Sequence, residues 1–222
     1  TTHHPPPITH HPSKVFVAGS SWPPDEEIFI RYFREHPEWK LIIAPHVIGE
    51  DHLQQIEKQL EDFEVVRYSK AKAPLSPPEG GTTGVPSKVK TIEAPSGAVG
   101  GAMASALIID CFGLLSSIYC YATVSYVGGG FGVGIHNTVE AAVWGVPVIF
   151  GPNNEKFQEA QELKACGGGF EIKSYDDFAR LMDRFDSDPQ FTAAAGRAAG
   201  LYVSQKAGAT RKILSDTVAH LK

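Results

Sequence analysis

The sequence predicts an α/β fold built on a doubly wound parallel sheet, and three observations support this class. Short apolar runs alternate with amphipathic helical segments over most of the 222 residues. The apolar runs stop at Gly, Pro or Asp, as buried strands do where they enter a loop. Carboxylates open several of the helical segments, as is common in first helical turns. In folds of this kind, ligands bind beyond the carboxyl ends of the strands.

The first strand and helix illustrate the pattern. A strand is predicted over 14–19, and a helix opens after Pro24 with Asp25, Glu26 and Glu27 in its first turn, where negative charge complements the helix dipole. The unit then repeats, with further strands predicted over 41–43, 64–68, 106–110, 123–127, 147–150 and 170–172. A second helix is predicted from residue 51, and others over 113–121, 137–144, 155–165, 175–185, 189–204 and 209–221.

Two segments depart from this alternation. Residues 1–13 mix proline and histidine without hydrophobic periodicity, so they predict a disordered arm. Its histidine pairs have no cysteine or carboxylate beside them, and a flexible arm does not preorganise a metal site. Residues 69–105 are rich in Pro, Gly, Ser, Thr and Ala, which predicts a mostly disordered insert. The rest of 14–222 is expected to form one domain.

The composition excludes several classes of protein. Lys and Arg number 20 against 25 Asp and Glu, a net charge of −5 that argues against a nucleic-acid partner. No run approaches the roughly 18 to 20 apolar residues of a membrane-spanning helix, and the first residues lack a signal-peptide pattern, so we expect a soluble, cytoplasmic chain. Cys111, Cys120 and Cys166 lie in apolar segments without a CxxC pair, which predicts buried, reduced thiols.

The most specific feature is the run from Gly128 to Glu140, in which five glycines lead from a strand into a predicted helix. Asn137 could cap this helix while Glu140 reaches back to it, and exposed loop amides at a helix start favour an anion such as phosphate. The run is not a GxGxxG fingerprint, and it is not a P-loop because Ile135 stands where that motif needs Lys. A capping box alone would also explain Asn137 and Glu140.

The segment from Gly129 to Pro152 resembles the donor-binding core of the bacterial Kdo transferases. These enzymes move 3-deoxy-D-manno-octulosonic acid (Kdo) from CMP-Kdo onto a lipid A precursor. The likeness extends to Gly19-Ser20-Ser21-Trp22, Pro45-His46, residues 110–114, residues 153–157 and Gly208-Ala209, in the same order and spacing. Only the arm and the insert fall outside it.

The resemblance implies a Rossmann-like domain, the C-terminal half of a GT-B glycosyltransferase, with residues 14–222 binding CMP-Kdo. Glu140 would accept hydrogen bonds from the ribose hydroxyls, as an ionised carboxylate can. No metal and no cofactor are implied. The residues that match the family's CMP-binding positions are Pro45, His46, Phe112, Gly113, Leu114, Asn137, Thr138, Val139 and Glu140.

Two positions differ from many members of the family. His46 stands where they carry Arg, and His grips a phosphate by charge only when it is protonated, so binding is expected to depend on pH. Leu114 stands where they carry Glu, although the family's use of main-chain groups there would survive this change.

The resemblance places the catalytic machinery outside this chain. In the family, the acidic general base, the acceptor site and the membrane-associating segment belong to an N-terminal domain, so no catalytic residue is expected here. The whole enzyme would act on lipid IVA, a lipid A precursor, at the cytoplasmic face of the bacterial inner membrane. This chain alone is expected to be inactive, because a positioned base contributes roughly 10²- to 10⁴-fold.

Two other functions remain open. The domain could serve a GT-B enzyme that uses a UDP- or GDP-sugar, since a glycine loop followed by a helix suits any nucleotide diphosphate. It could also be a non-catalytic nucleotide-binding module. Asp186-Ser187-Asp188 mimics a metal-binding DxD motif, but its place before Pro189 favours a helix-capping turn.

Overall fold

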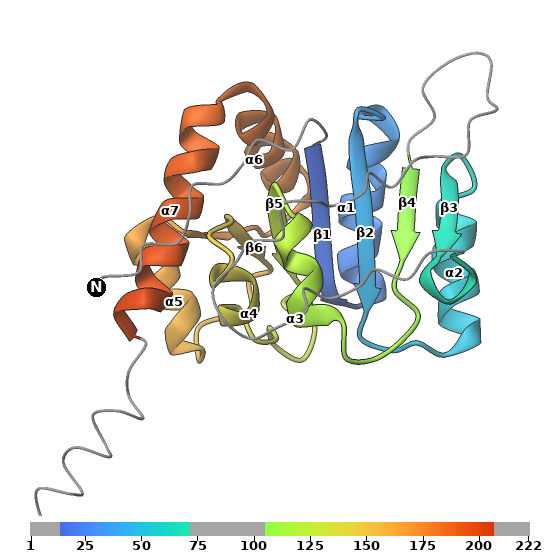
Figure 1. Cartoon of the computed structure of the whole chain (residues 1–222), viewed down its shortest axis with the longest axis horizontal. Helices are drawn as coiled ribbons and strands as arrows, with labels where there is room; N and C mark the ends of the chain where they lie inside the picture. The colour runs from blue at the N-terminus through green and yellow to red at the C-terminus, as the bar shows by residue number, and fades with distance from the viewer. Residues whose placement is uncertain (1–13, 72–104, 207–222) are drawn as a thin grey trace, which may run out of the picture.

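The computed structural model describes residues 14–71 and 105–206 (Figure 1). The predicted arm at 1–13, most of the predicted insert at 69–105 and the predicted helix at 209–221 lie outside these ranges. Both ends of the insert are described. Residues Tyr68–Lys70 form a short 3-10 helix and Ser105 belongs to a strand, so the described ends of the predicted insert have regular structure.

A seven-stranded sheet forms the centre of the described part of the chain. Its order is β3-β4-β2-β1-β5-β6-β7, and every neighbouring pair is parallel. This confirms the predicted fold class. The strands are β1 (Lys14–Ser21), β2 (Trp39–Pro45), β3 (Glu64–Arg67), β4 (Ser105–Ile108), β5 (Val124–Val127), β6 (Val148–Phe150) and β7 (Gly169–Glu171).

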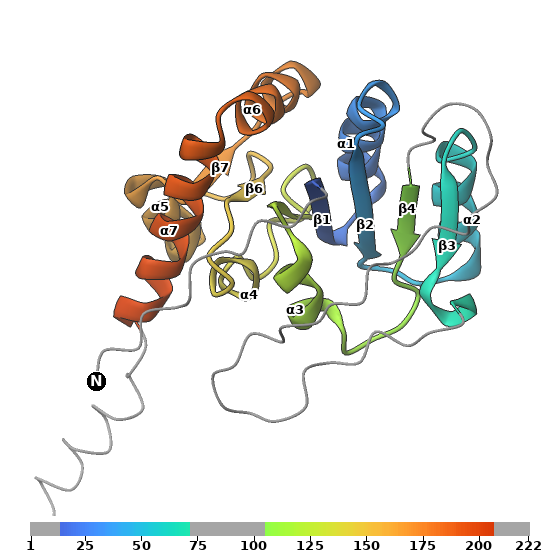
Figure 2. The same ribbon diagram turned by 45° about the horizontal axis from the view of Figure 1, so that its top comes forward.

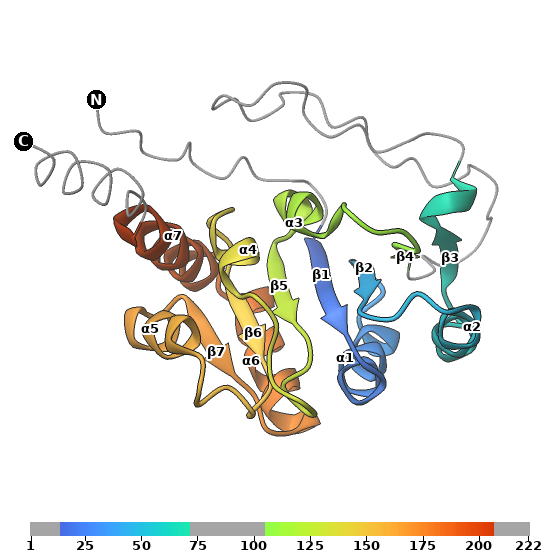
Figure 3. The same ribbon diagram turned by 90° about the horizontal axis from the view of Figure 1, so that it is seen from below.

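Helices cover both faces of the sheet, as Figure 2 and Figure 3 show. The faces alternate along each strand: in β1, Phe16 and Ala18 pack with α1, α2 and α6, whereas Val17 packs with α3, α4, α5 and α7. The helices are α1 (Pro23–Glu35), α2 (Glu50–Gln59), α3 (Leu115–Ile118), α4 (Val139–Ala142), α5 (Gln158–Cys166), α6 (Tyr175–Ser187) and α7 (Pro189–Lys206). None of these described helices is long and apolar enough to span a membrane.

The path of the chain creates one switch point in the sheet. From β1 the chain moves outward through β2 to β3, then returns to place β4 between β2 and β3. It next crosses to the other side of β1 to form β5 and continues outward to β7. The loops that follow β1 and β5 therefore diverge to opposite sides, which opens a crevice at their carboxyl ends.

Two predicted helices near this crevice are wrong in length. The helix predicted over 113–121 is one α-helical turn, α3, continued by a 3-10 turn at Tyr119–Tyr121. The helix predicted over 137–144 is only Val139–Ala142. Gly113 (φ +88°) lies in a left-handed conformation, which explains why the first helix begins only after it.

The cysteine prediction is partly wrong. All three thiols are free, as expected. Cys111 and Cys120 are partly buried, but Cys166 is exposed. Cys166 is the last residue of α5, where the chain turns through Gly167, so its side chain escapes the core that the preceding turns of the helix enter.

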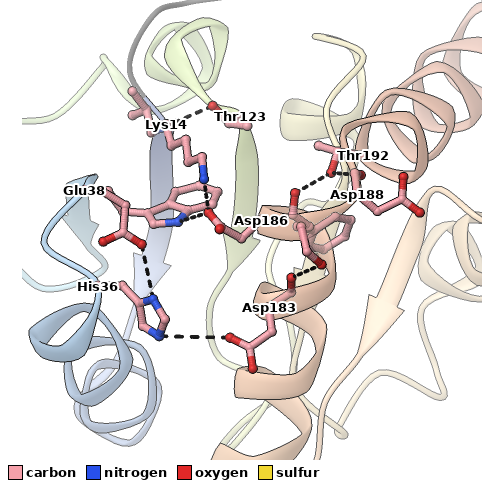
Figure 4. A network of polar contacts seen from close by, with 12 residues as sticks. Lys14, His36, Glu38, Thr123, Asp183, Asp186, Asp188 and Thr192 are labelled. Carbon is pink, nitrogen blue, oxygen red and sulfur yellow. Dashed lines mark hydrogen bonds and ion pairs between the residues drawn. The ribbon is translucent and has the colours of Figure 1, made fainter.

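Asp186 and Asp188 lie near the amino ends of the strands, opposite the crevice (Figure 4). Asp186 pairs with Lys14 and accepts a hydrogen bond from Trp39 Nε1 at 2.8 Å, so it ties α6 to the amino ends of β1 and β2. Asp188 accepts a hydrogen bond from the Phe191 amide at 2.9 Å and thereby caps α7. The predicted capping turn is confirmed, and these carboxylates stand at the far end of the strands from the crevice.

Candidate functional site

Three aromatic side chains from three different loops stack at the switch point. Trp22 follows β1, His46 follows β2 and His136 follows β5. The Trp22 and His46 rings lie 4.8 Å apart between centroids, and the His46 and His136 rings lie 4.4 Å apart, each pair within 24° of parallel. The Trp22 indole Nε1 also donates to Nε2 of His136 at 3.3 Å. This stack brings His46 and the glycine loop into one site.

The hydrogen bond from Trp22 fixes the state of His136. Because Nε2 accepts a hydrogen bond, it carries no proton, and the remaining ring proton is on Nδ1. Partial burial and the neighbouring His46 ring both lower the pKa of His136. His136 is therefore a neutral hydrogen-bond donor at this site and supplies no charge to a phosphate.

The carboxylate of Asp25 anchors the glycine loop to the start of α1. One oxygen accepts hydrogen bonds from the Trp22 and Gly129 amides, both at 2.9 Å, and the other accepts from the Tyr126 hydroxyl at 2.7 Å. Asp25 is almost completely buried. A buried carboxylate needs such donors, and here they come from three segments that meet at the crevice.

The end of β1 is shaped to let the glycine loop approach. Ser20 adopts a left-handed conformation (φ +52°), and the pairing of β1 with β2 shifts register between Gly19 and Ser21. A Cβ on Gly128 would lie 2.3 Å from the Ser20 carbonyl oxygen, so only glycine fits there. Strained conformations of this kind cluster at functional sites.

The glycine loop does not offer the bare row of amides that its sequence suggests. The amides of Gly128, Gly129, Gly132, Gly134 and His136 all donate to groups of the chain itself. The following helix is a single turn, which has little dipole to attract an anion. These loop amides are therefore engaged within the chain, and the anion site expected at the helix start stays a prediction.

The four residues 137–140 stand beside this stack. Asn137 accepts from the Val139 amide at 3.0 Å and donates to the Glu140 carboxylate at 3.1 Å. The Glu140 carboxylate thus accepts a hydrogen bond from the side chain of Asn137 and not from the backbone amide of Asn137, so the predicted capping box is incomplete. Thr138 is buried, whereas Asn137 is exposed and Glu140 half-buried. One oxygen of Glu140 is bonded to Asn137, and the carboxylate can accept further hydrogen bonds from hydroxyl groups of a ligand.

The other predicted residues lie at the same edge in the loops after β2 and β4. Pro45 is buried as the last residue of β2, and His46 is exposed beyond it. Phe112 is 81% exposed, Gly113 forms a turn, and Leu114 packs partly against the core. No described contact joins Phe112–Leu114 directly to the aromatic stack.

Longer links hold the loop after β4 against the Asn137–Glu140 segment. The Trp144 indole, just after α4, donates to the Ser116 carbonyl in α3 at 2.7 Å. Burial, and secondarily the charge of Glu140, raise the pKa of Tyr119, whose hydroxyl lies against Gly19 at the end of β1. The three predicted segments therefore surround the carboxyl ends of β1, β2, β4 and β5.

Comparisons with known proteins bear on the family and the fold of the chain. No family model matches the chain. The 3-deoxy-D-manno-octulosonic acid transferase of Aquifex aeolicus is 30% identical over 167 residues, which cover 72% of this chain and 38% of that protein. The C-terminal CMP-Kdo binding domain of WaaA from Acinetobacter baumannii superposes with a TM-score of 0.62 at 18% identity, covering 87% of this chain and 89% of that one. The resemblance to the Kdo transferases is confirmed.

The fold alone is shared more widely. Anabaena HepE in complex with UDP-glucose superposes with a TM-score of 0.54 at 15% identity, covering 94% of this chain and 49% of that one. The predicted fold, the C-terminal half of a GT-B glycosyltransferase, is likewise confirmed. The chain spans less than half the length of the Aquifex transferase.

Sequence reasoning left several residues of the site out of the binding set. Trp22, His136 and Asp25 form its framework, yet Trp22 counted only as part of a matching motif and Asp25 only as a charge at a helix start. Their contacts join positions more than 100 residues apart, as between Trp22 and His136, which no local pattern reveals. Within the described ranges, no group of three or more His, Cys, Asp or Glu side chains could hold a metal ion.

Proposed function

We propose that this chain is the donor-binding domain of a Kdo transferase and that it holds the CMP part of CMP-Kdo at the switch point. The observation that carries the proposal is the convergence of Pro45-His46, Phe112–Leu114 and Asn137–Glu140 on one edge of the sheet. The similarity to the Aquifex transferase and to the CMP-Kdo binding domain of WaaA supports this donor over others with the same fold.

Each segment has a distinct role in this proposal. His46 is exposed and stacked on its neighbours, so it can present an imidazolium to the CMP phosphate. Glu140 accepts hydrogen bonds from the ribose hydroxyls, and Asn137 orients its carboxylate. The turn at Phe112–Leu114 offers main-chain groups to the base. His136 remains neutral and supports His46 through stacking.

The whole enzyme would transfer Kdo to a lipid A precursor, lipid IVA, at the cytoplasmic face of the inner membrane. The general base, the acceptor site and the membrane attachment are assigned to a separate N-terminal domain. This chain alone should therefore give no useful transfer when CMP-Kdo and acceptor lipid are added, since a missing base costs roughly 10²- to 10⁴-fold. Robust transfer by this chain would contradict the assignment of catalysis to another domain.

Calorimetric titration with CMP, UMP and GMP at about pH 6 and about pH 8 tests the donor assignment. We expect CMP to bind selectively and more tightly at the lower pH. Glu140→Ala should weaken binding by about 10- to 100-fold, the loss expected for hydrogen bonds to a charged acceptor. Glu61→Ala is the matched control, because Glu61 is an exposed carboxylate in the turn before β3, at the amino ends of the strands and so at the far end from the site.

His46→Arg separates the role of this side chain from the rest. Arg keeps its charge at every pH, so the affinity of the variant for CMP should fall less between about pH 6 and about pH 8 than that of the wild type. Preferential binding of UMP or GMP would favour a UDP- or GDP-sugar donor, and no binding of any nucleotide would favour a module of another function.

A further inference from the structure

A closed ring of hydrogen bonds clamps the loop that carries His46. The His46 amide donates to the Ser21 carbonyl at 2.9 Å, and the Ser21 hydroxyl bonds to one oxygen of Glu26 at 2.9 Å. The other oxygen of Glu26 lies 2.9 Å from His52 Nε2, and His52 Nδ1 lies 2.8 Å from the Val47 carbonyl. The ring thus returns to the residue next to His46.

This ring needs one proton that the two side chains share. The Val47 carbonyl can only accept, so His52 Nδ1 must carry a hydrogen. The contact between His52 Nε2 and Glu26 then also needs a hydrogen, either on the carboxyl or on the ring. A carboxylate facing a neutral imidazole with its proton on Nδ1 would place two lone pairs 2.9 Å apart. If the His52 proton moved from Nδ1 to Nε2, the lone pair of Nδ1 would instead face the lone pairs of the Val47 carbonyl oxygen.

The surroundings favour keeping this proton. The Glu26 side chain is fully buried, and desolvation raises its pKa, opposed by the hydrogen bonds from His52 and Ser21. Asp25 is the other charged group that acts on Glu26, and it too disfavours a second negative charge. His52 lies in the first turn of α2 with Glu50 and Asp51, of which Glu50 is paired with Arg67 of β3.

We propose that Glu26 and His52 are positioning residues for donor binding, which hold the His46 loop in place through one shared proton. This inference rests on the proposed function of His46 as a donor contact. Neither residue touches the ligand. When the pair loses its proton, one of the two His52 contacts breaks, the loop opens and the phosphate contact is lost.

The size of the effect follows from linkage. Opening of the loop at higher pH releases the one proton that the closed ring holds. The population of the open loop should therefore rise by up to about tenfold per pH unit, until the closed ring itself deprotonates. The His46 amide donates to the Ser21 carbonyl, so its protection factor against hydrogen exchange, from which the intrinsic pH dependence is divided out, reports this population directly.

Glu26→Gln is the deciding variant. The glutamine oxygen can accept from Ser21 and its amide can donate to His52 Nε2, so the ring closes without a titrating proton. The protection factors should then stay constant between about pH 6 and about pH 9, whereas those of the wild type fall. Glu27→Gln removes the same charge at the next, exposed residue and should behave as the wild type.

Nucleotide titration completes the experiment. Glu26→Gln and the wild type should bind CMP about equally at about pH 6, and the variant should bind more tightly as the pH rises. The contribution of His46 is common to both proteins, so it cancels in the ratio of their affinities. Protection factors in the wild type that do not change with pH would overturn the inference, as would a variant that loses protection as the wild type does. Absence of CMP binding in both proteins would instead contradict the proposed function.

Discussion

Removing the Asp25 carboxylate should destabilise the fold by about 4 kcal/mol. Asp25→Ala leaves the Trp22 and Gly129 amides without their acceptor and the Tyr126 hydroxyl without its partner. Each unsatisfied buried donor costs about 1–3 kcal/mol, and the Gly129 amide and the Tyr126 hydroxyl, whose bonds to Asp25 are buried, together give about 2–6 kcal/mol. A domain of this size is stable by only about 5–15 kcal/mol, so the variant should lie near the limit of folding.

Two gentler variants make this estimate testable. Asp25→Asn keeps one oxygen for the two amides, and the Tyr126 hydroxyl can rotate to accept from the new amide, so only the charge assistance is lost, at about 1–2 kcal/mol. Tyr126→Phe removes one donor to a charged acceptor, at about 1.5–3 kcal/mol. Combined with Asp25→Ala, Tyr126→Phe should cost almost nothing more, because its partner is already gone.

Urea unfolding followed by circular dichroism measures these differences, and the slope of free energy against urea should stay unchanged. A loss below about 1 kcal/mol for Asp25→Ala would refute the reasoning, since it would mean that water replaces the carboxylate. Additive effects of Asp25→Ala and Tyr126→Phe would refute the pairing of these two side chains.

Three further predictions concern the loop, the stack and the acid limb of stability. Gly128→Ala should destabilise by several kcal/mol in urea unfolding, because its Cβ would meet the Ser20 carbonyl, whereas Gly132→Ala, with its nearest neighbour at 3.8 Å, should be tolerated; equal losses would contradict this. Trp22→Phe keeps an aromatic ring but removes the donor to His136, so the pKa of His136 should rise in an NMR titration, and an unchanged value would contradict the assigned tautomer. A hydrogen bond from Lys164, then one from Asn154, lowers the pKa of Glu171 to about 2, so the wild type should lose about 2 kcal/mol as the pH falls from about 4.5 to about 2, and Glu171→Gln should lose less; parallel curves would contradict this.

The fold class could be predicted because it depends on local periodicity. The alternation of Phe16 and Ala18 with Val17 on the two faces of β1 is visible in the sequence, as is the spacing of apolar residues in the helices. The position of β4 between β2 and β3 could not be predicted, because it depends on where the chain returns after a long connection. The helix predicted from residue 113 begins too early because the left-handed Gly113 overrides the helical periodicity.

The candidate site could be predicted only in part. Motif resemblance brings His46 and Glu140 to the same edge of the sheet, although no local pattern states that they are neighbours. Three consecutive carboxylates at the start of α1 suggested complementary charge for the helix dipole, but only Glu27 is exposed. Asp25 and Glu26 turn inward, one to the glycine loop and one to His52, because distant donors compensate the cost of their burial.

The two proton-dependent groups on the loop after β2 act in the same direction. A phosphate favours protonated His46, and the ring of Glu26 and His52 favours the loop conformation that presents it. If dissociation of CMP is coupled to the loss of one proton from His46 and one from the Glu26–His52 pair, the CMP dissociation constant should rise by up to about a hundredfold per pH unit. A single titrating group would give about tenfold. The Glu26→Gln variant should retain the shallower dependence that belongs to His46, and His46→Arg the one that belongs to the ring. The slope of the logarithm of the CMP dissociation constant against pH therefore gives the number of protons linked to binding, and each variant lowers that number by one.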